Sequence, residues 1–202
     1  MIDLKGKTSC IFGLRGTGKS TLLNYVANHF GNKALVYDTL HEVPKEAKYN
    51  VYKPINRYNA GELELVTKSV IESKQYHFFA IDEANRFCLP KPNPLPPFIA
   101  DLNDQCRHYQ ITVFYLARRP TQLNQDLTEL ADYLFIFHLK GKNDIRYLED
   151  LSLGLGDVVL SLSPFNFVLV MPNRSFKAYS PIIPDKLWLD RAILLLKARH
   201  PN

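Results

Sequence analysis

Short apolar runs alternate along this chain with stretches in which apolar residues recur every three or four positions. The runs are rich in β-branched and aromatic residues, as expected of buried strands, and the spaced stretches are typical of helices that cover a sheet. This order predicts an α/β fold built on a mostly parallel sheet. The predicted strands are 9–12, 33–38, 77–83, 111–117 and 133–138, with a short extended piece at 49–54, and the predicted helices are 21–30, 61–73, 98–108, 126–131 and 144–151.

The C-terminal part of the chain has a different pattern. Apolar runs at 165–170 and 175–179 flank a Pro-Asn-Arg turn, which predicts a β-hairpin, and residues 184–199 have the spacing of an amphipathic helix. A proline-rich stretch at 89–97 can supply few N–H groups to a helix or a sheet, so we expect a stiff exposed loop there. It is either a contact loop for a subunit or substrate, or a rigid connector.

A glycine-rich turn lies between the first predicted strand and the first predicted helix. It satisfies GxxxxGK[ST] at every fixed position, and the strand and helix beside it are the context that a phosphate-binding loop requires. Glycines let successive backbone N–H groups at the helix start point at phosphate oxygens. A turn that merely caps a helix would need no Lys-Ser pair at this spacing. The predicted nucleotide-binding residues are Gly13, Leu14, Arg15, Gly16, Thr17, Gly18, Lys19, Ser20 and Thr21.

The last three residues of this loop have separate expected roles. Lys19 reaches the β- and γ-phosphates as a point charge, and the Ser20 hydroxyl ligates a Mg²⁺ ion that keeps most of its waters. Thr21 is expected near the α-phosphate. The predicted ligands are therefore a nucleoside triphosphate and Mg²⁺.

Carboxylates follow two of the predicted strands. Asp82 and Glu83 end a buried run, which places them at the carboxyl edge of the sheet beside the phosphate-binding loop. Asp82 is expected to hold Mg²⁺ through water, and Glu83 to orient and deprotonate the attacking water, because hydrolysis needs a group that activates solvent. Asp38, with Glu42 four residues later, either contacts the water shell of the metal or caps a local turn.

Two adjacent arginines, Arg118 and Arg119, follow the strand predicted at 111–117. The guanidinium fork matches phosphate geometry, so this pair is a candidate for contact with a γ-phosphate or a phosphodiester, with at least one of the two a solvated surface charge. Residues 140–144 do not form the guanine-recognition pattern NKxD, because the Asn and Lys are reversed. A GTPase switch is thereby disfavoured.

Composition narrows the class of protein. The 202 residues are 46% hydrophobic and 22% charged, so we expect one soluble domain over residues 1–202. The net charge of +5 suits an anionic partner and fits a mildly basic enzyme equally well. Cys10, Cys88 and Cys106 lack CxxC spacing, which favours a reducing compartment and disfavours a disulfide framework or a zinc site. Neither a signal peptide nor a membrane span is indicated, so a cytosolic protein is expected.

Three segments resemble a known family. Residues 82–87, Asp-Glu-Ala-Asn-Arg-Phe, resemble the DEAHRF signature after the Walker B strand of the FtsK–HerA ATPases. Residues 107–111 and 119–121 resemble that family's GRKxGI and QRPS segments, with matching spacing. The resemblance covers residues 13–151. The compact size makes the chain similar to the genome-packaging ATPases of membrane-containing double-stranded DNA viruses, which implies a three-layer P-loop NTPase of the RecA/ASCE type.

Those ATPases are ring-forming motors, so the resemblance implies an ATP-hydrolysing double-stranded DNA translocase that fills a preformed capsid. It implies the nucleotide, metal and water-activating roles given above, and it makes Arg107 a trans-acting arginine finger, with ATP between subunits. The implied partners are DNA bound without sequence preference, other copies in a homo-oligomeric ring such as a hexamer, and capsid or viral membrane proteins at a packaging vertex. The implied location is the host cytoplasm or the virion.

One residue departs from the family pattern. The family usually has Gln before the Arg-Pro pair as a γ-phosphate sensor, and this chain has Arg118. Either Arg118 takes that role with a full charge, or the sensing and finger roles are distributed among Arg107, Arg118 and Arg119. The catalytic candidates are therefore Glu83, Lys19, Arg107, Arg118 and Arg119.

Lys140, Lys142 and Arg146 are the candidate group for contact with DNA phosphates, and a solvated charged face is the alternative. Two other functions stay open. One is a small-molecule or nucleoside kinase, although the Asp82–Glu83 pair favours hydrolysis. The other is a nucleotide-dependent morphogenesis or secretion protein that does not move DNA.

Overall fold

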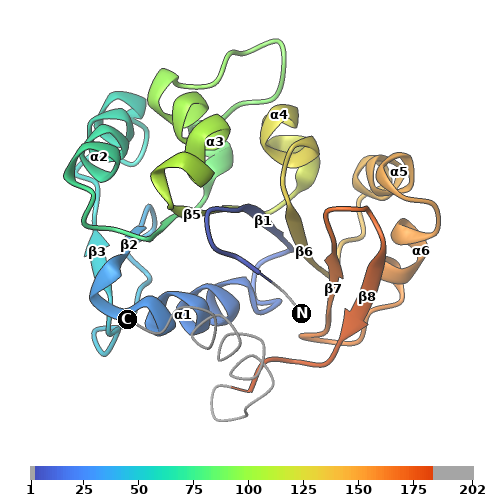
Figure 1. Ribbon diagram of the computed structural model, residues 1–202. Coiled ribbons are helices and arrows are strands. Elements are labelled where there is room, and N and C mark those ends of the chain that lie inside the picture. The colour runs from blue at the N-terminus through green and yellow to red at the C-terminus, as the bar shows by residue number, and fades with distance from the viewer. Residues whose placement is uncertain (1–2, 184–202) are drawn as a thin grey trace.

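An eight-stranded sheet runs through the middle of the protein and has helices on both faces (Figure 1). The structure is a computed structural model and describes residues 3–183. The strands are β1 Thr8–Phe12, β2 Ala34–Tyr37, β3 Asn50–Tyr52, β4 Phe78–Ile81, β5 Thr112–Ala117, β6 Tyr133–Phe137, β7 Phe167–Val170 and β8 Phe176–Tyr179. The predicted α/β fold is confirmed.

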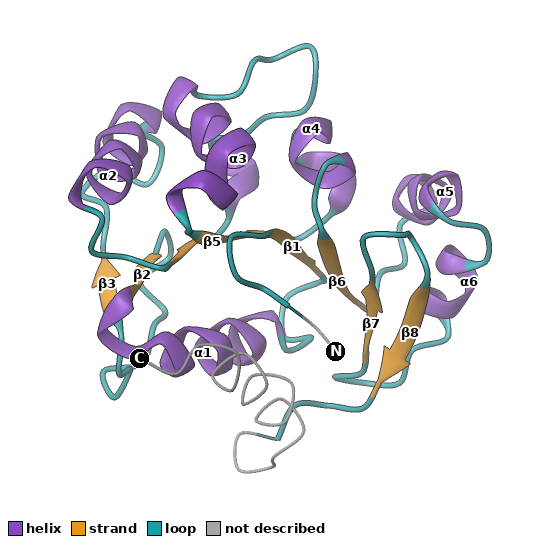
Figure 2. Ribbon diagram, in the orientation of Figure 1, coloured by secondary structure: helices purple, strands orange, loops and turns teal. Residues whose placement is uncertain are grey.

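The helices alternate with the strands of the first two thirds of the chain, as the apolar pattern predicted. They are α1 Lys19–Phe30, α2 Ala60–Ser73, α3 Pro97–Tyr109, α4 Gln125–Glu129, α5 Lys142–Leu151 and α6 Leu155–Leu160, with 3₁₀ turns at Gly31–Lys33, Ala84–Arg86 and Pro120–Gln122. Figure 2 shows α1 on one face of the sheet and α2, α3 and α4 on the other. No helix within residues 3–183 is long and apolar enough to cross a membrane.

The strand order is β3-β2-β4-β5-β1-β6-β7-β8. The first six strands of that order are parallel, and β7 and β8 continue the sheet as an antiparallel hairpin. Parallel strands present their carboxyl ends at one edge, so the residues that follow β1, β2, β4 and β5 meet there. The predicted hairpin is confirmed, and the helix predicted at 184–199 lies outside the described residues.

The core has two parts because successive side chains of a strand point to opposite faces of the sheet. Cys10 and Phe12 pack with the helices α2 to α6, whereas Ile11 packs with α1. All five residues of β1 are buried. A strand that is covered on both sides favours apolar residues on both faces, which is why Cys10, Ile11 and Phe12 show no polar alternation, although Thr8 and Ser9 at the start of β1 are polar and buried.

Helix α6 is not among the predicted elements. Gly154 precedes it and Gly156 is its second residue, and glycine is a poor helix former. Gly156 is required by close packing: a Cβ there would lie 2.8 Å from a side-chain atom of Ile145 and 2.8 Å from Glu149 Oε1. Glu149 also accepts the N–H groups of Gly154 and Gly156 at 2.8 and 2.7 Å. Contact with α5 therefore stabilises a helix that its own sequence does not favour.

The proline-rich stretch is exposed but anchored at several points. The Asn124 side-chain amide donates to the backbone carbonyls of Leu89 and Asn93, at 2.9 and 3.0 Å. Lys91 forms an ion pair with Asp126 at 2.6 Å. These contacts fix the loop against the start of α4, which accounts for its connector role; a contact with another molecule stays a prediction.

Candidate nucleotide-binding site

The turn between β1 and α1 passes directly over Phe137, the last residue of the neighbouring strand β6. A Cβ on Gly13 would lie 2.7 Å from Phe137 Cβ, and a Cβ on Gly18 would lie 3.0 Å from Phe137 Cε1. Gly18 also has a φ of +112°, which other residues rarely adopt. Two of the motif glycines thus allow the loop to lie against the Phe137 ring. The sequence analysis missed Phe137, since it looks like any other apolar strand residue.

Lys19 lies at the first position of α1 and folds back over its own loop. Its Nζ donates to the carbonyl oxygens of Gly13 and Leu14, at 2.7 and 3.1 Å. Burial lowers the pKa of Lys19, while the Glu83 and Asp82 carboxylates act in the opposite direction. The ammonium group is thus a partly desolvated cation at a helix N-terminus, where an anion is favoured.

The ends of β2, β4 and β5 complete a cavity in front of this loop. Its volume is about 250 Å³, somewhat below the ~300 Å³ at which ligand pockets usually begin, so it suits the phosphate end of a nucleotide. The predicted juxtaposition of the loop with the two acids is therefore present. The lining residues are Arg15, Gly16, Lys19, Ser20, Leu40, Glu42, Asp82, Glu83 and Arg118.

The two acids after β4 are held differently. Burial, together with the nearby carboxylates of Glu83 and Asp38, raises the pKa of Asp82 to about 7. Glu83 is buried and has a left-handed backbone, with φ 51° and ψ 42°, a conformation that costs energy in a non-glycine residue. Its Oε1 accepts from Arg118 Nε at 2.9 Å. The turn thus positions Glu83 against an arginine, whereas Asp82 forms no ion pair within residues 3–183.

Asp38 acts as a turn cap. Its two carboxylate oxygens accept the backbone N–H groups of Glu42 and Val43, at 2.9 and 3.0 Å, and the side chain is buried. Of the two roles left open by the sequence, the structure shows the local one. Glu42 itself lines the cavity.

These residues fit a nucleotide with Mg²⁺. Asp82 and Glu83 bring two carboxylates to a site whose protein cations are Lys19, Arg15 and Arg118, and burial raises the pKa of Asp82, so a metal cation near its carboxylate would be favoured. Among residues 3–183, no three His, Cys, Asp or Glu side chains gather to hold a metal by themselves. A Mg²⁺ ion would therefore rely on the Ser20 hydroxyl, water and phosphate oxygens, the ligand set it commonly takes beside one carboxylate.

The two adjacent arginines point to different partners. Arg118 lines the cavity, whereas Arg119 Nε donates to Asp144 Oδ2 at 2.7 Å. Thr121 Oγ1 donates to the other oxygen of Asp144 at 2.6 Å. Arg119 therefore joins the end of β5 to the start of α5, and the structure does not bring it into the cavity.

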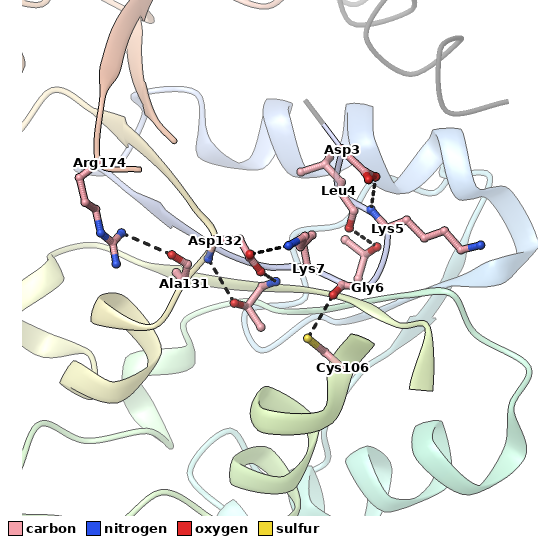
Figure 3. A network of polar contacts seen from close by, with 11 residues as sticks. Asp3, Leu4, Lys5, Gly6, Lys7, Cys106, Ala131, Asp132 and Arg174 are labelled. Carbon is pink, nitrogen blue, oxygen red and sulfur yellow. Dashed lines mark hydrogen bonds and ion pairs between the residues drawn. The ribbon is translucent and has the colours of Figure 1, made fainter. Parts of the chain in front are cut away.

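Arg107 lies at the opposite edge of the sheet. It is exposed, lies two residues before the end of α3, and lines a separate cavity of about 350 Å³ with Asn103 and Asp132. Figure 3 shows the N-terminal segment across this edge, with Cys106 Sγ donating to the Gly6 carbonyl at 3.4 Å. Within one subunit, Arg107 is thus outside the nucleotide cavity.

The three basic residues proposed for DNA contact lie beside and on α5. Lys140, Lys142 and Arg146 are all exposed. Nothing in the described residues distinguishes them from a solvated charged face, so DNA contact through this group stays a prediction.

Comparison with protein-family models and with curated proteins finds no match. Solved structures do match. The DNA-packaging ATPase B204 from Sulfolobus Turreted Icosahedral Virus has a TM-score of 0.76 and 17% identity over 90% of this chain and 100% of that chain. The genome packaging NTPase B204 from Sulfolobus turreted icosahedral virus 2, in complex with ATP-gammaS, has a TM-score of 0.73 and 18% identity over 88% of this chain and 98% of that chain.

A further match is the N-terminal domain of zonular occludens toxin from Neisseria meningitidis, with a TM-score of 0.50 and 13% identity over 87% of this chain and 95% of that chain. At such identities the similarity establishes the fold. The resemblance seen in the sequence motifs is confirmed at that level: the chain has the P-loop NTPase fold of the viral genome-packaging ATPases.

Proposed function

We propose that the chain is an ATP-hydrolysing double-stranded DNA translocase that packages a viral genome into a preformed capsid. One observation carries the hydrolytic part: Glu83 lies in the same cavity as Lys19, Ser20 and Asp82, and its carboxylate is held by Arg118. The structural neighbours named for genome packaging support the extension to DNA. The folded-back Lys19 and the loop amides would bind the phosphates, and Mg²⁺, when bound, supplies charge that neutralises them.

Glu83 is the base of the proposed reaction. Because Arg118 Nε holds Oε1, the second oxygen, Oε2, is left to accept a proton from water. Burial limits the water that can reach this carboxylate, and the left-handed turn fixes its direction. Arg118 is exposed enough to contact a γ-phosphate as well, so one guanidinium would serve both the base and the substrate.

Arg107 is proposed as the finger that completes the site of a neighbouring subunit. Its place at the edge opposite to the nucleotide cavity leaves no role in the site of its own subunit. Hydrolysis would then depend on assembly, because a finger stabilises the transition state only when subunits meet. That dependence is the property a ring motor needs to order its steps.

The test is ATPase rate against protein concentration, with and without duplex DNA. Specific activity should rise as subunits associate and rise again with DNA. Glu83→Gln should lower hydrolysis by about 10²–10⁴-fold while nucleotide binding persists. Phosphoryl transfer to a small acceptor in place of hydrolysis would establish a kinase instead. An ATPase rate that does not change with DNA but requires a coat-protein partner would establish a morphogenesis factor.

A further inference from the structure

The segment that joins β3 to α2, residues 53–59, displays large apolar side chains to solvent. Ile55 is 97% exposed and Tyr58 is 78% exposed. Lys53 and Arg57 are exposed beside them. We call this segment the 53–59 loop. Ile55 and Tyr58 lie at the carboxyl edge of the sheet and belong to neither core cluster, so packing of the core does not account for them.

The backbone of the 53–59 loop is nevertheless held in one shape. Glu62, in the first turn of α2, accepts the N–H groups of Ile55 and Asn56 at 2.8 and 3.1 Å and the Tyr52 hydroxyl at 3.0 Å. Asn56 Oδ1 accepts the Tyr58 N–H at 3.0 Å. The hydrogen bond from Ile55 and its neighbours lowers the pKa of Glu62, so the carboxylate stays ionised in this clamp. A fixed backbone lowers the entropy lost when the exposed side chains bind a partner.

The charge of this surface selects the partner. The Arg86 guanidinium lies over the Tyr58 ring, 5.2 Å from its centroid, which adds a third cation to Lys53 and Arg57. The nearby acid, Glu62, is engaged by backbone N–H groups. Lysine, arginine and tyrosine side chains are the groups that contact the phosphates of nucleic acid without reading its sequence.

The same surface is connected to the nucleotide site. Arg86 ends the 3₁₀ turn Ala84–Arg86, and its N–H donates to the Glu83 carbonyl at 2.9 Å. The residue that stacks on Tyr58 is thus three positions from the proposed base, on one short hydrogen-bonded turn. A movement of that turn would carry Arg86 and the ring beneath it together.

We propose that the 53–59 loop binds the phosphates of duplex DNA, and that the Arg86–Tyr58 stack couples this contact to the Glu83 turn. The inference rests on the proposed translocase function. It replaces the group Lys140, Lys142 and Arg146 as the principal DNA contact, because none of those residues contacts the turn Ala84–Arg86 that follows Glu83, whereas Tyr58 does so through Arg86.

The first test is duplex DNA binding by the full chain as a function of salt. The double variant Lys53→Ala/Arg57→Ala should reduce the slope of log K against log salt by about 2 and weaken binding by on the order of tenfold or more near 0.1 M salt. The matched control, Lys140→Ala/Lys142→Ala, removes the same charge and should leave the slope within about 0.5 of the wild type. The reverse result would overturn the inference.

The outcomes separate the inference from the function on which it rests. If the wild type does not bind duplex DNA and its ATPase rate does not change with DNA, the proposed translocase function is wrong, and the inference about the 53–59 loop is wrong with it. If the wild type binds DNA and the Lys53→Ala/Arg57→Ala variant keeps the full slope, the inference alone fails. A change in oligomeric state of the DNA-free variant, measured by sedimentation, would make the loop a subunit interface and also overturn the inference.

The second test addresses the coupling. Tyr58→Ala should reduce the stimulation of ATPase by saturating DNA at least fivefold, because the ring under Arg86 is lost. Tyr58→Phe keeps the ring and should retain the stimulation within twofold. Full stimulation of the ATPase by DNA in Tyr58→Ala, or an equal loss of stimulation in both variants, would show that the Arg86–Tyr58 stack does not couple DNA binding to hydrolysis.

Discussion

The two edges of the sheet differ in how their charged groups are paired. At the carboxyl edge, Asp82 has a raised pKa, Lys19 is partly desolvated and Glu83 holds a left-handed backbone. At the opposite edge, Lys7 pairs with Asp132 at 2.8 Å, and Asp132 also accepts the Thr8 N–H at 3.1 Å (Figure 3). The carboxyl edge holds its charged groups around a cavity, whereas the opposite edge pairs Lys7 with Asp132 within the chain and leaves one buried neutral oxygen, Asn103 Oδ1, without a hydrogen-bond partner among the described residues.

This difference indicates that the carboxyl edge is the one that a ligand would stabilise. Buried charges without full compensation cost free energy that a bound nucleotide and cation can recover. The opposite edge instead holds the N-terminal segment in place. Thr112 Oγ1, for example, donates to the Leu4 carbonyl at 2.7 Å. Arg107 is the exception there, because it is exposed and has no place in the network that Figure 3 shows.

Substitution of Arg107 should therefore have the largest effect at the opposite edge. Arg107→Ala should lower kcat by on the order of 10³-fold, since a trans finger stabilises transition-state charge. Stability should be nearly unchanged, because the side chain is exposed. Mixing Arg107→Ala with Lys19→Ala subunits should restore activity at mixed interfaces, where the second variant supplies the finger. Mixed oligomers that assemble and stay inactive would refute the trans role.

Arg118 tests the carboxyl edge itself. Arg118→Ala should lower kcat by on the order of 10²-fold, because it leaves the buried Glu83 carboxylate without its partner and removes a donor from the phosphates. Arg118→Gln should retain activity within about tenfold, since an amide can still donate to the Glu83 oxygen. Steady-state ATPase kinetics measure both. Equal losses in the two variants would mean that the charge, and not a hydrogen bond, is required.

Substitutions of two glycines in the phosphate-binding loop should have smaller effects, on the free energy of unfolding, and one serves as the control for the other. Gly18→Ala should lower the free energy of unfolding by about 2 kcal/mol, because it forces a left-handed φ on alanine and presses Cβ against Phe137. Gly16→Ala has open space around its Cβ and should lower it by only about 1 kcal/mol. Denaturant unfolding of both variants measures the difference. No difference would show that Phe137 does not constrain the loop.

Much of the carboxyl edge could be predicted from the sequence. A fixed motif between a strand and a helix identified Lys19 and Ser20, and an apolar run that ends in two acids identified Asp82 and Glu83. Local spacing suffices for these, because each residue is positioned by the strand it follows. The strands, the helices α1 to α5 and their order follow from the same periodicity, whereas α6 does not.

Contacts between distant segments could not be predicted in this way. The Arg118–Glu83 pair joins residues 35 positions apart, and its formation depends on β4 lying next to β5. Arg119 is chemically identical to its neighbour, yet the chain after β5 turns it toward Asp144. Phe137 and the capping role of Asp38 likewise depend on which backbone lies beside them. Strand order, and not composition, decides these roles.

Substitution of Asp132, at the edge opposite the nucleotide cavity, should have the smallest effect on stability and activity. Asp132→Asn keeps an acceptor for the Thr8 N–H but removes the charge that pairs with Lys7, so the free energy of unfolding should fall by about 1 kcal/mol. The exposed pair Lys68–Glu72, at 3.7 Å, is the matched control, and Glu72→Gln should cost about 0.3 kcal/mol. Denaturant unfolding measures both, and kcat of assembled Asp132→Asn should stay within twofold of the wild type. A loss of activity in Asp132→Asn without a loss of stability would place this edge in the catalytic interface, because the network would then be holding Arg107 in position for the neighbouring subunit.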